Sequence, residues 1–257
     1  MSAPRSGVRP LCEGGAVRRA RPALGILGGM GPLATADFYR RLVARTPADS
    51  DQGHIPVLMW ADPAVPDRTA ALLGLGPSPV PALVAGARWL KQAGARCLAV
   101  PCNTAHAYVE QVAKATGIEV LDMIQAALHA AASTGPDTTR VGILATQGTR
   151  RAGLYERAGS RLGIEVLQVS ARLQITSVDP AIRAVKAGAE LVEPEQQIAT
   201  AAKALKKQGA QVIIAACTEI PLISGVAARI MPVVDSTDAL VDTAVSRLWR
   251  AGQPCSS

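Results

Sequence analysis

The stretch ALGILGGMGPLA (residues 23–34) determines the fold expected for the whole chain. Its first six residues are apolar and predict a buried strand, and the glycines that follow predict a tight turn. Pro32 then stands where a helix would begin, because proline is well suited to the first helical position. A strand, a glycine turn and a helix in this order indicate an α/β sheet protein.

The same alternation of short apolar runs and longer helical patterns continues to the end of the chain. Further strands are predicted at 55–60, 96–101, 118–123, 140–145, 164–169, 211–216 and 231–235. Helices are predicted at 32–46, 80–93, 104–115, 124–133, 149–160, 178–188, 193–208 and 236–250. Nearly continuous apolar strands that alternate with helices are typical of a parallel sheet covered on both faces.

Three landmarks of the first half recur in the second half in the same order. GILGGMG begins at residue 25 and GILATQG begins 117 residues later, at residue 142. Cys102 and Cys217 are 115 residues apart, and Asp122 and Asp235 are 113 apart. This spacing indicates a duplicated domain rather than a short repeat. We expect two Rossmann-like or flavodoxin-like parallel-sheet domains, related by a pseudo-two-fold axis, with the active site in the cleft between them.

The turn-rich segment STGPDTT (133–139) is the clearest break between the two halves. Five arginines in the first 22 residues suggest an extension outside the fold. The expected division is a flexible Arg-rich extension (1–22), a first domain with Cys102 (23–123 and 235–250), a second domain with Cys217 (124–234) and a tail (251–257).

The composition excludes several classes of protein. Of the 257 residues, 49% are hydrophobic and 18% charged, which allows a sizeable core and argues against disorder. The net charge is +7, but five arginines and one glutamate lie in the first 22 residues, so the rest carries only +3. That balance and only seven aromatic residues argue against nucleic-acid binding. Without a membrane-length apolar run or a secretory signal, a cytoplasmic protein with reduced thiols is expected.

Five cysteines are present, and no two of them have the C-x-x-C spacing of zinc or thioredoxin-like sites. Cys12 and Cys255 lie near the termini and are expected to have no function, and Cys97 lies in an apolar run typical of a core. Cys102 and Cys217 each end an apolar strand, where open α/β sheets bind ligands. If the two halves face one cleft, the two thiols approach a ligand carbon from opposite sides.

The residues after Cys102 suit an activated thiol. Asn103 and Thr104 favour a helix cap, which would place the thiol near the positive end of a helix and lower its pKa. His106, four residues after the cysteine, would lie on the same helix face and orient the thiol. A metal site is not expected, because further ligands are not apparent.

The residues after Cys217 are Thr218, a similar candidate cap, and Glu219. Glu219 would suit a substrate ammonium, although its charge would disfavour a nearby thiolate. The alternative for both cysteines is that they fill the core, since free cysteine is often buried. Their symmetric placement beside polar residues favours a function.

Other segments suggest a small anionic ligand. GGMGPLA loosely matches a dinucleotide-binding fingerprint, but the acidic residue expected about 20 positions later is missing, so a small carboxylate fits better. ATQGT (145–149) is its counterpart, and its Thr146 and Thr149 hydroxyls would hold a carboxylate oxygen. Arg68 and Lys186 are candidate carboxylate clamps, with ordinary surface charges as the alternative.

Seven motifs in order resemble those of the cofactor-independent aspartate/glutamate racemase family, particularly its aspartate branch. They are GILGGMGPLATADFYRRLV, DQGHIPVL, PDRTAALL, PCNTAH, VLDMI, VGILATQGT and ACTEIPL, and the resemblance covers residues 23–250. The chain departs from the pattern at Ala216, where glycine is usual.

The resemblance implies two α/β domains, a homodimer, and catalysis without pyridoxal phosphate or a metal. It implies that Cys102 and Cys217 are the two acid/base residues. It also assigns substrate binding to several residues: Asn103, Thr104, Thr146, Thr149 and Thr218 for the α-carboxylate and amino groups, Arg68 and Lys186 as the basic residues, and Met30 and Gln52 along the pocket.

The expected activity is therefore interconversion of L- and D-aspartate, or glutamate, by proton transfer at the α-carbon. Because both cysteines are present, proton transfer on two faces is favoured over the chemistry of relatives that keep one. The alternatives are a related dicarboxylate isomerase or decarboxylase, and a non-catalytic two-lobed protein that binds an anion. The expected partner is a small acidic amino acid, with no nucleic acid and no membrane.

Overall fold

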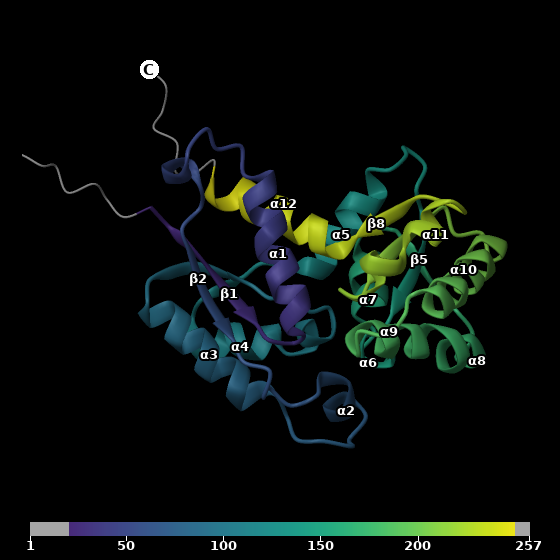
Figure 1. Cartoon of the computed structure of the whole chain (residues 1–257), viewed down its shortest axis with the longest axis horizontal. Helices are drawn as coiled ribbons and strands as arrows, with labels where there is room; N and C mark the ends of the chain where they lie inside the picture. Colours follow the sequence, from purple (N-terminus) through teal and green to yellow (C-terminus); the bar gives the residue numbers. More distant parts are fainter. Residues whose placement is uncertain (1–20, 250–257) are drawn as a thin grey trace, which may run out of the picture.

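The computed structural model describes residues 21–249. The chain forms two parallel four-stranded sheets, one from each half (Figure 1). The first has the order β2-β1-β3-β4 and the second the order β6-β5-β7-β8, so each strand has a counterpart at the same place in the other sheet. This arrangement confirms the predicted α/β fold of two similarly built halves.

All eight predicted strands are present, most of them shorter than predicted. Their bounds are β1 (Ala23–Gly28), β2 (Val57–Ala61), β3 (Ala95–Ala99), β4 (Glu119–Val120), β5 (Arg140–Ala145), β6 (Glu165–Gln168), β7 (Val212–Ala216) and β8 (Val233–Asp235).

The predicted helices are present, but two of them are divided. The helix predicted at 104–115 begins as a 3-10 turn, and that predicted at 149–160 is interrupted at Gly153, whose φ is 58°. The principal helices are α1 (Pro32–Arg45), α3 (Val80–Gln92), α4 (Val109–Thr116), α5 (Met123–Ala132), α6 (Gln147–Arg151), α7 (Leu154–Arg161), α9 (Asp179–Lys186), α10 (Val192–Lys207) and α12 (Ser236–Leu248).

Several short helical segments were not predicted from the sequence. They are η1 (Asp51–Gly53), α2 (Arg68–Leu72), α8 (Ala171–Leu173), the π-helical turn η3 (Gln174–Val178), η4 (Ile220–Ile223) and α11 (Gly225–Ala228). The 3-10 turn η2 (Thr104–Ala107) is the start of the helix predicted at 104–115. The segments α2 and η2 carry residues of the site described below. Within residues 21–249, no helix combines the length and apolar character needed to cross a membrane.

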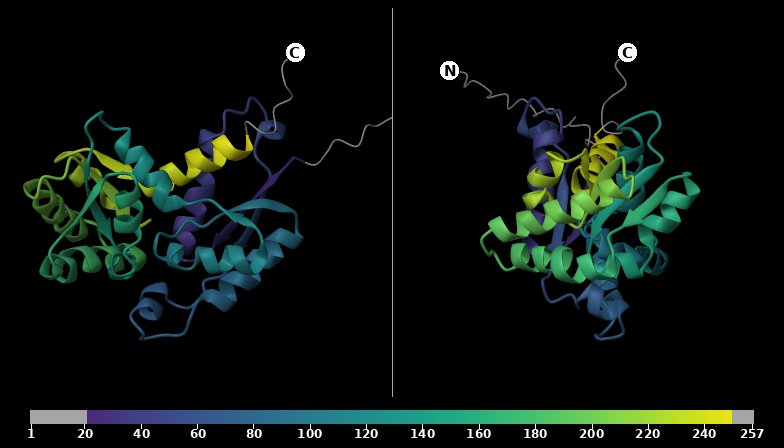
Figure 2. Two further views of the ribbon diagram at one scale, coloured as in Figure 1. Left: turned by 180° about the vertical axis from the view of Figure 1, so that it is seen from behind. Right: turned by 90° about the vertical axis from the view of Figure 1, so that its right-hand side faces the viewer.

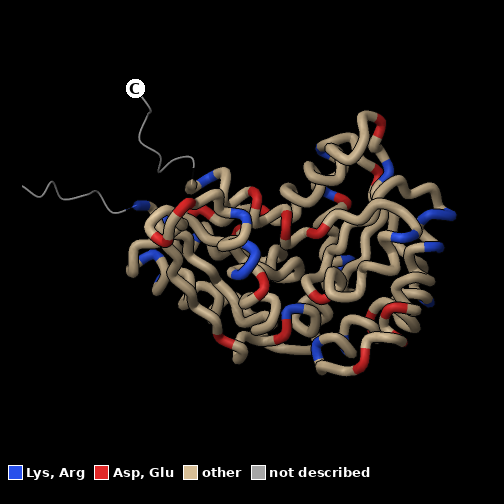
Figure 3. Tube along the Cα trace, turned by 45° about the horizontal axis from the view of Figure 1, so that its top comes forward, with Lys and Arg blue, Asp and Glu red and all other residues tan. Residues whose placement is uncertain are grey.

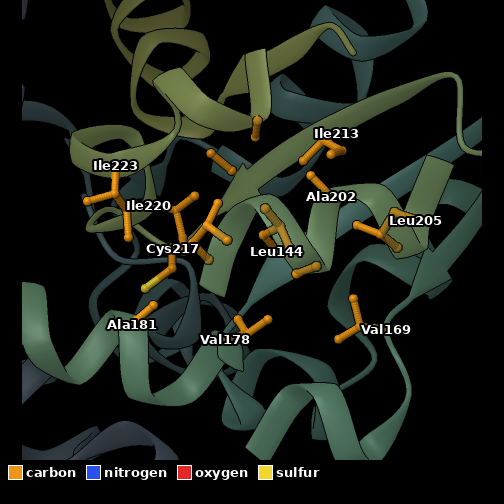
Figure 4. Close-up of a cluster of buried hydrophobic side chains, with 14 of the residues drawn as sticks. Leu144, Val169, Val178, Ala181, Ala202, Leu205, Ile213, Cys217, Ile220 and Ile223 are labelled. Atoms are coloured by element: carbon orange, nitrogen blue, oxygen red, sulfur yellow. The ribbon is translucent and has the colours of Figure 1, made fainter. Parts of the chain in front are cut away.

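Each sheet has helices on both faces, as the apolar strands predicted. In β1, Leu24 and Ile26 pack against α1 and α12, whereas Leu27 packs on the opposite face against α3. In the second sheet, Val141 packs toward α5 and α7, and Leu144 packs toward α9 and α10. Figure 4 shows the layer that contains Leu144, with Cys217 among its apolar side chains.

Helix α12 returns from the end of β8 to the first half of the chain (Figure 2). Its Leu240 and Leu248 join the core that contains Leu24. Arg41 of α1 is paired with Asp235 and, at 2.7 Å, with Asp238. These contacts support assigning 235–250 to the first domain, and the division at 123/124 stays a proposal. The predicted flexible extension (1–22) and tail (251–257) lie almost wholly outside the described residues.

Basic and acidic residues are interspersed over both halves in the view of Figure 3. The carboxyl ends of β3 and β5 lie where the halves meet, because the Thr104 and Thr146 hydroxyls that follow them share a hydrogen bond. The strand β7, which leads to Cys217, pairs with β5. The fold therefore brings the two repeated motifs together.

Candidate active site

Cys102 and Cys217 line the same cavity, which we call the inner cavity. Both side chains are largely buried, with 7% and 5% exposure. The first half contributes Met30, Asp67, Arg68, Thr69, Cys102, Asn103 and Thr104, and the second half contributes Thr146, Lys186, Cys217, Thr218 and Glu219. The predicted convergence of two thiols from two strand ends is thus present in the geometry of this chain.

The inner cavity has a volume of about 20 Å³, and a second, outer pocket of about 290 Å³ shares Asp67, Arg68, Lys186, Thr218 and Glu219 with it. The inner cavity has room for roughly one water molecule, so an amino acid there would require the halves or side chains to move. The outer pocket is lined by Gly31, Pro32, Leu33, Ala34, Asp37, Asp67, Arg68, Val185, Lys186, Thr218, Glu219 and Leu222.

The Cys217 thiol donates a hydrogen bond to Oε2 of Glu219 at 2.9 Å. Thr218 donates to the same oxygen at 3.2 Å, and the Lys186 ammonium lies 3.8 Å from Oε1. Burial raises the pKa of Cys217 well above its usual value, and the charge of Glu219 adds to this effect while Lys186 opposes it. Cys217 is therefore a protonated thiol at neutral pH.

Lys186 lines the inner cavity together with the two thiols and the Glu219 carboxylate. Burial opposes its charge, but Cys217, Glu219 and Cys102 together raise the pKa of its ammonium. Arg68 is held by backbone carbonyls: Nη1 donates to Val65 and Pro66 at 3.1 Å each, and Nη2 donates to Met30 at 3.2 Å. Among the described residues, its buried Nε has no partner.

Three threonine hydroxyls from the two halves form a triangle. Thr104 lies 2.9 Å from Thr146 and 3.0 Å from Thr149, and the last two lie 3.1 Å apart. Thr146 caps α6, because its hydroxyl accepts the Thr149 N–H at 3.1 Å. Thr149 is fully buried and is the one member of the triangle that does not line the inner cavity.

Asn103 and Thr104 do not cap a helix, contrary to the prediction. Asn103 has a helical backbone, and its carboxamide bonds Tyr155 and Ser236 instead. The Thr104 hydroxyl is engaged in the threonine triangle. Asn103 stands at the N-cap position of the 3-10 turn η2 (Thr104–Ala107), but no side chain there accepts an N–H of the turn.

His106 contacts the backbone of Cys102 rather than its thiol. Nδ1 lies 3.0 Å from the Cys102 carbonyl, and Nε2 accepts the Met123 N–H at 3.1 Å. The tautomer with a proton on Nδ1 satisfies both bonds, and burial lowers the pKa of the imidazole. Residues 21–249 contain no group of three or more His, Cys, Asp or Glu side chains that could hold a metal ion.

Gln52 is the predicted site residue that the structure does not bring to the cavity. It is exposed in η1, ahead of the amino end of β2, whereas the cavity lies at the carboxyl ends of the strands. Its carbonyl accepts a hydrogen bond from Arg21. Glu219, expected to hold a substrate ammonium, is instead bonded to Cys217 and Thr218.

Sequence reasoning missed four residues in or beside the site. Asp67 and Thr69 line the inner cavity through α2, and Asp67 caps that helix by accepting the Ala70 N–H at 2.7 Å. An aspartate directly before the first residue of a helix, whose carboxylate accepts an N–H of the first turn, is a recognisable cap signal in the sequence. Tyr155 and Ser236, the partners of Asn103, carry no comparable local signal.

The chain matches the family model described as Asp/Glu/hydantoin racemase over residues 27–244. The chain belongs to this racemase family. It is therefore a racemase, an isomerase by reaction class, and the cavity between its halves is the candidate active site.

Similar proteins agree with this assignment. The broad specificity amino-acid racemase RacX of Bacillus subtilis is 25% identical over 229 residues, which cover 87% of this chain and 96% of that protein. The aspartate racemase of Picrophilus torridus has a TM-score of 0.77 and 27% identity, covering 88% of this chain and 94% of that one. A glutamate racemase from Francisella tularensis shares the fold, with a TM-score of 0.68 and 17% identity, covering 92% of this chain and 84% of that one.

Proposed function

We propose that this racemase interconverts the L- and D-enantiomers of an acidic amino acid, aspartate first, with Cys102 and Cys217 as the two acid/base groups. The observation that carries the proposal is that both thiols line one cavity, each supplied by a different half. A racemase needs a proton removed from one face of the α-carbon and returned to the other. Two groups on opposite walls satisfy that requirement.

In the proposed reaction, the thiolate of one cysteine takes the α-proton and becomes a thiol. The thiol of the other cysteine gives its proton to the opposite face of the carbanion and becomes a thiolate. The roles are exchanged for the reverse direction, so protons and charges balance. Positioned acid/base groups typically contribute about 10²- to 10⁴-fold each.

The resting state favours Cys217 as the acid, because its pKa is raised well above the usual value. Cys102 is then the base in that direction. In the opposite direction Cys217 must lose its proton, and Glu219 Oε2, already its hydrogen-bond acceptor, is placed to receive it. The positive charge of Lys186 offsets the negative charge carried by Glu219 or by either cysteine as a thiolate.

The remaining polar groups are suited to the substrate carboxylates. Arg68, Lys186 and the hydroxyls of Thr104, Thr146 and Thr218 line the inner cavity from several sides. Preplaced donors of this kind stabilise the negative charge that develops on an α-carboxylate as the proton leaves. We assign the α-carboxylate to the threonine hydroxyls and the side-chain carboxylate to Arg68 and Lys186.

The name of the Picrophilus relative, aspartate racemase, supports aspartate as the first substrate to test. Glutamate differs by one methylene, a difference worth only about 1–3 kcal/mol in a pocket.

A second candidate is a broader range of amino acids, favoured by the apolar side of the outer pocket. Leu33 and Leu222 are 64% and 44% exposed there, beside Pro32 and Ala34. A substrate side chain that extends past Arg68 would meet these apolar groups. The RacX relative, named for broad specificity, agrees with this candidate.

The accompanying proposals are a reaction without pyridoxal phosphate or a metal, a homodimer, and a cytoplasmic location. The rival proposals are a dicarboxylate isomerase or decarboxylase and a non-catalytic anion-binding protein. A dicarboxylate isomerase or decarboxylase would form a chemically different product without interconverting enantiomers. A binding protein would bind aspartate without exchanging its α-proton.

The experiment is proton NMR of L-aspartate and L-glutamate with the purified protein in D₂O, with no added cofactor and with reduced thiols. Loss of the α-proton signal, with the D-enantiomer identified by chiral chromatography, is the expected result for aspartate. A panel of neutral L-amino acids measures the range. Retention of every α-proton signal would reject the proposed racemisation of these amino acids.

A further inference from the structure

A chain of buried hydrogen bonds connects the two cysteine-bearing loops. The Tyr155 hydroxyl donates to Oδ1 of Asn103 at 2.6 Å, and Nδ2 of Asn103 donates to the Ser236 hydroxyl at 3.0 Å. The Ser236 hydroxyl donates to the Ala215 carbonyl at 2.7 Å. Tyr155 and Ser236 are fully buried, and Asn103 is 2% exposed. We call these four residues the relay.

The relay runs from one cysteine to the other. Asn103 follows Cys102 directly, and Ala215 lies in β7 two positions before Cys217. Tyr155 belongs to α7, and Ser236 is the first residue of α12, the helix that returns to the first half. Because its members come from four separate segments, the relay fixes the position of the Cys102 loop on the sheet that carries Cys217.

The direction of every hydrogen bond in the relay is determined by the Ala215 carbonyl, which can only accept. Ser236 must therefore donate to Ala215 and accept from Asn103, so the NH₂ of the carboxamide faces Ser236 and its oxygen faces Tyr155. A flipped carboxamide would place two acceptors against each other at Ser236. The relay thus holds Asn103 in one orientation.

Asn103 also lines the inner cavity, and an amide nitrogen has two N–H donors. One of them is used by Ser236, which leaves the other for a ligand oxygen. We propose that Tyr155 and Ser236 are positioning residues that orient the Asn103 carboxamide toward the substrate. The inference rests on the proposed function, since the ligand is taken to be the amino acid held between the two thiols.

The test is a double-mutant cycle that deletes one oxygen atom at a time. Tyr155→Phe and Ser236→Ala are made alone and together with Asn103→Ala. The kcat and KM of α-proton exchange with aspartate are measured in D₂O, and the Kd of aspartate is measured by calorimetry. Thr116→Val is the matched control, because its buried hydroxyl bonds a carbonyl in α4, away from the inner cavity.

We expect each relay variant to lower kcat/KM for aspartate by roughly 10- to 100-fold, as a misplaced binding group does. In the Asn103→Ala background the same changes should have little further effect, because Tyr155 and Ser236 act through Asn103. A purely structural role would lower the melting temperature and the activity equally in both backgrounds. Full-size effects in the Asn103→Ala background, or relay variants as active as Thr116→Val, would overturn the inference.

Measurements of aspartate binding and of α-proton exchange distinguish a failure of the proposed racemisation from a failure of the proposed role of the relay. Aspartate binding without α-proton exchange would reject the proposed racemisation, and the cycle in Kd would then decide the role of the relay on its own. A wild-type protein that neither binds aspartate nor exchanges its α-proton would reject the orientation of Asn103 toward that substrate together with the proposed function.

Discussion

The thiol of Cys217 donates to Oε2 of Glu219 at 2.9 Å, while Lys186 lies 3.8 Å from the other oxygen of the same carboxylate. The carboxylate therefore has two opposite effects in the proposed reaction. Its charge keeps Cys217 protonated, and its position makes it the nearest acceptor when that proton must leave. A variant that replaces the carboxylate with an amide tests both effects, each by its own measurement.

Glu219→Gln is expected to lower the pKa of Cys217, because the carboxylate is the second cause, after burial, that raises it. It is also expected to lower kcat/KM for racemisation by about 10²-fold or more from either enantiomer, because an acid/base partner is lost and the equilibrium constant of one makes kcat/KM equal in the two directions. Ultraviolet thiolate absorbance against pH measures the first effect, with the signal of Glu219→Gln/Cys217→Ser subtracted. Initial rates from each aspartate enantiomer measure the second.

The control for this variant is Glu190→Gln, which removes an exposed carboxylate outside both pockets. It should leave the Cys217 titration and both initial rates unchanged. An unchanged Cys217 pKa in Glu219→Gln would contradict the assigned electrostatic role.

Cys102→Ser and Cys217→Ser should each reduce racemisation by about 10²- to 10⁴-fold, because a serine hydroxyl is a far weaker acid than a thiol. Cys97→Ala is the matched control: burial raises the pKa of Cys97 to about 11, and its side chain lies in the core of the first sheet. Its kcat should stay near that of the wild type. Near-normal turnover by either serine variant would reject the two-base mechanism.

The fold was predictable because its signals are local and repeated. Each strand is an apolar run, and the recurrence of GILGGMG as GILATQG indicated two halves before any contact was known. The short segments escaped prediction because they carry too few residues for a helical period to appear. Helix α2 has five residues, and its signal lies in the Asp67 cap rather than in hydrophobic spacing.

The site was predictable only where a motif carried it. Cys102 and Cys217 follow β3 and β7, which belong to different sheets, and Arg68 begins α2 after β2; all three line the inner cavity where the two halves meet. Asn103 was misinterpreted as a cap because its true partners, Tyr155 and Ser236, are 52 and 133 residues away in sequence. Gln52 was assigned to the pocket only because it matches a motif of the family. In the structure it lies in η1 before β2, away from the inner cavity. Pairings of this kind depend on tertiary packing.

The stability of the protein should fall as the pH decreases below about 6.5, because His106 is buried in its neutral form and its pKa is lowered by burial. In that range the unfolded chain binds a proton that the folded chain excludes, so protonation favours unfolding. Urea unfolding between about pH 7.5 and 5.5 measures the free energy of unfolding.

His106→Gln should flatten this pH dependence while lowering stability at neutral pH, since the bonds to Cys102 and Met123 are changed. His129→Gln alters an exposed histidine and should keep the dependence of the wild type. An equally steep dependence in His106→Gln would assign it to other groups.

Gly148→Ala tests whether the close approach of the two halves is needed for activity. Gly148 lies in α6, and a Cβ there would stand 2.6 Å from Oγ1 of Thr69 and 2.9 Å from Cγ2 of Thr104. Both neighbours line the inner cavity. The added methyl group should push α6 away from α2 and separate the Thr146 hydroxyl of the second half from the Thr104 hydroxyl of the first half.

The expected result for Gly148→Ala is a loss of roughly 10-fold or more in kcat/KM, because displacements of about 1 Å at a reacting site are costly. Global stability should change little, since alanine favours a helix over glycine by about 1 kcal/mol and offsets part of the strain. Gly225→Ala is the matched control, because a Cβ at that helical glycine meets nothing within 4 Å. Activity and melting temperature, measured together, decide the outcome. Full activity in Gly148→Ala would mean that the halves tolerate a wider separation than this geometry implies.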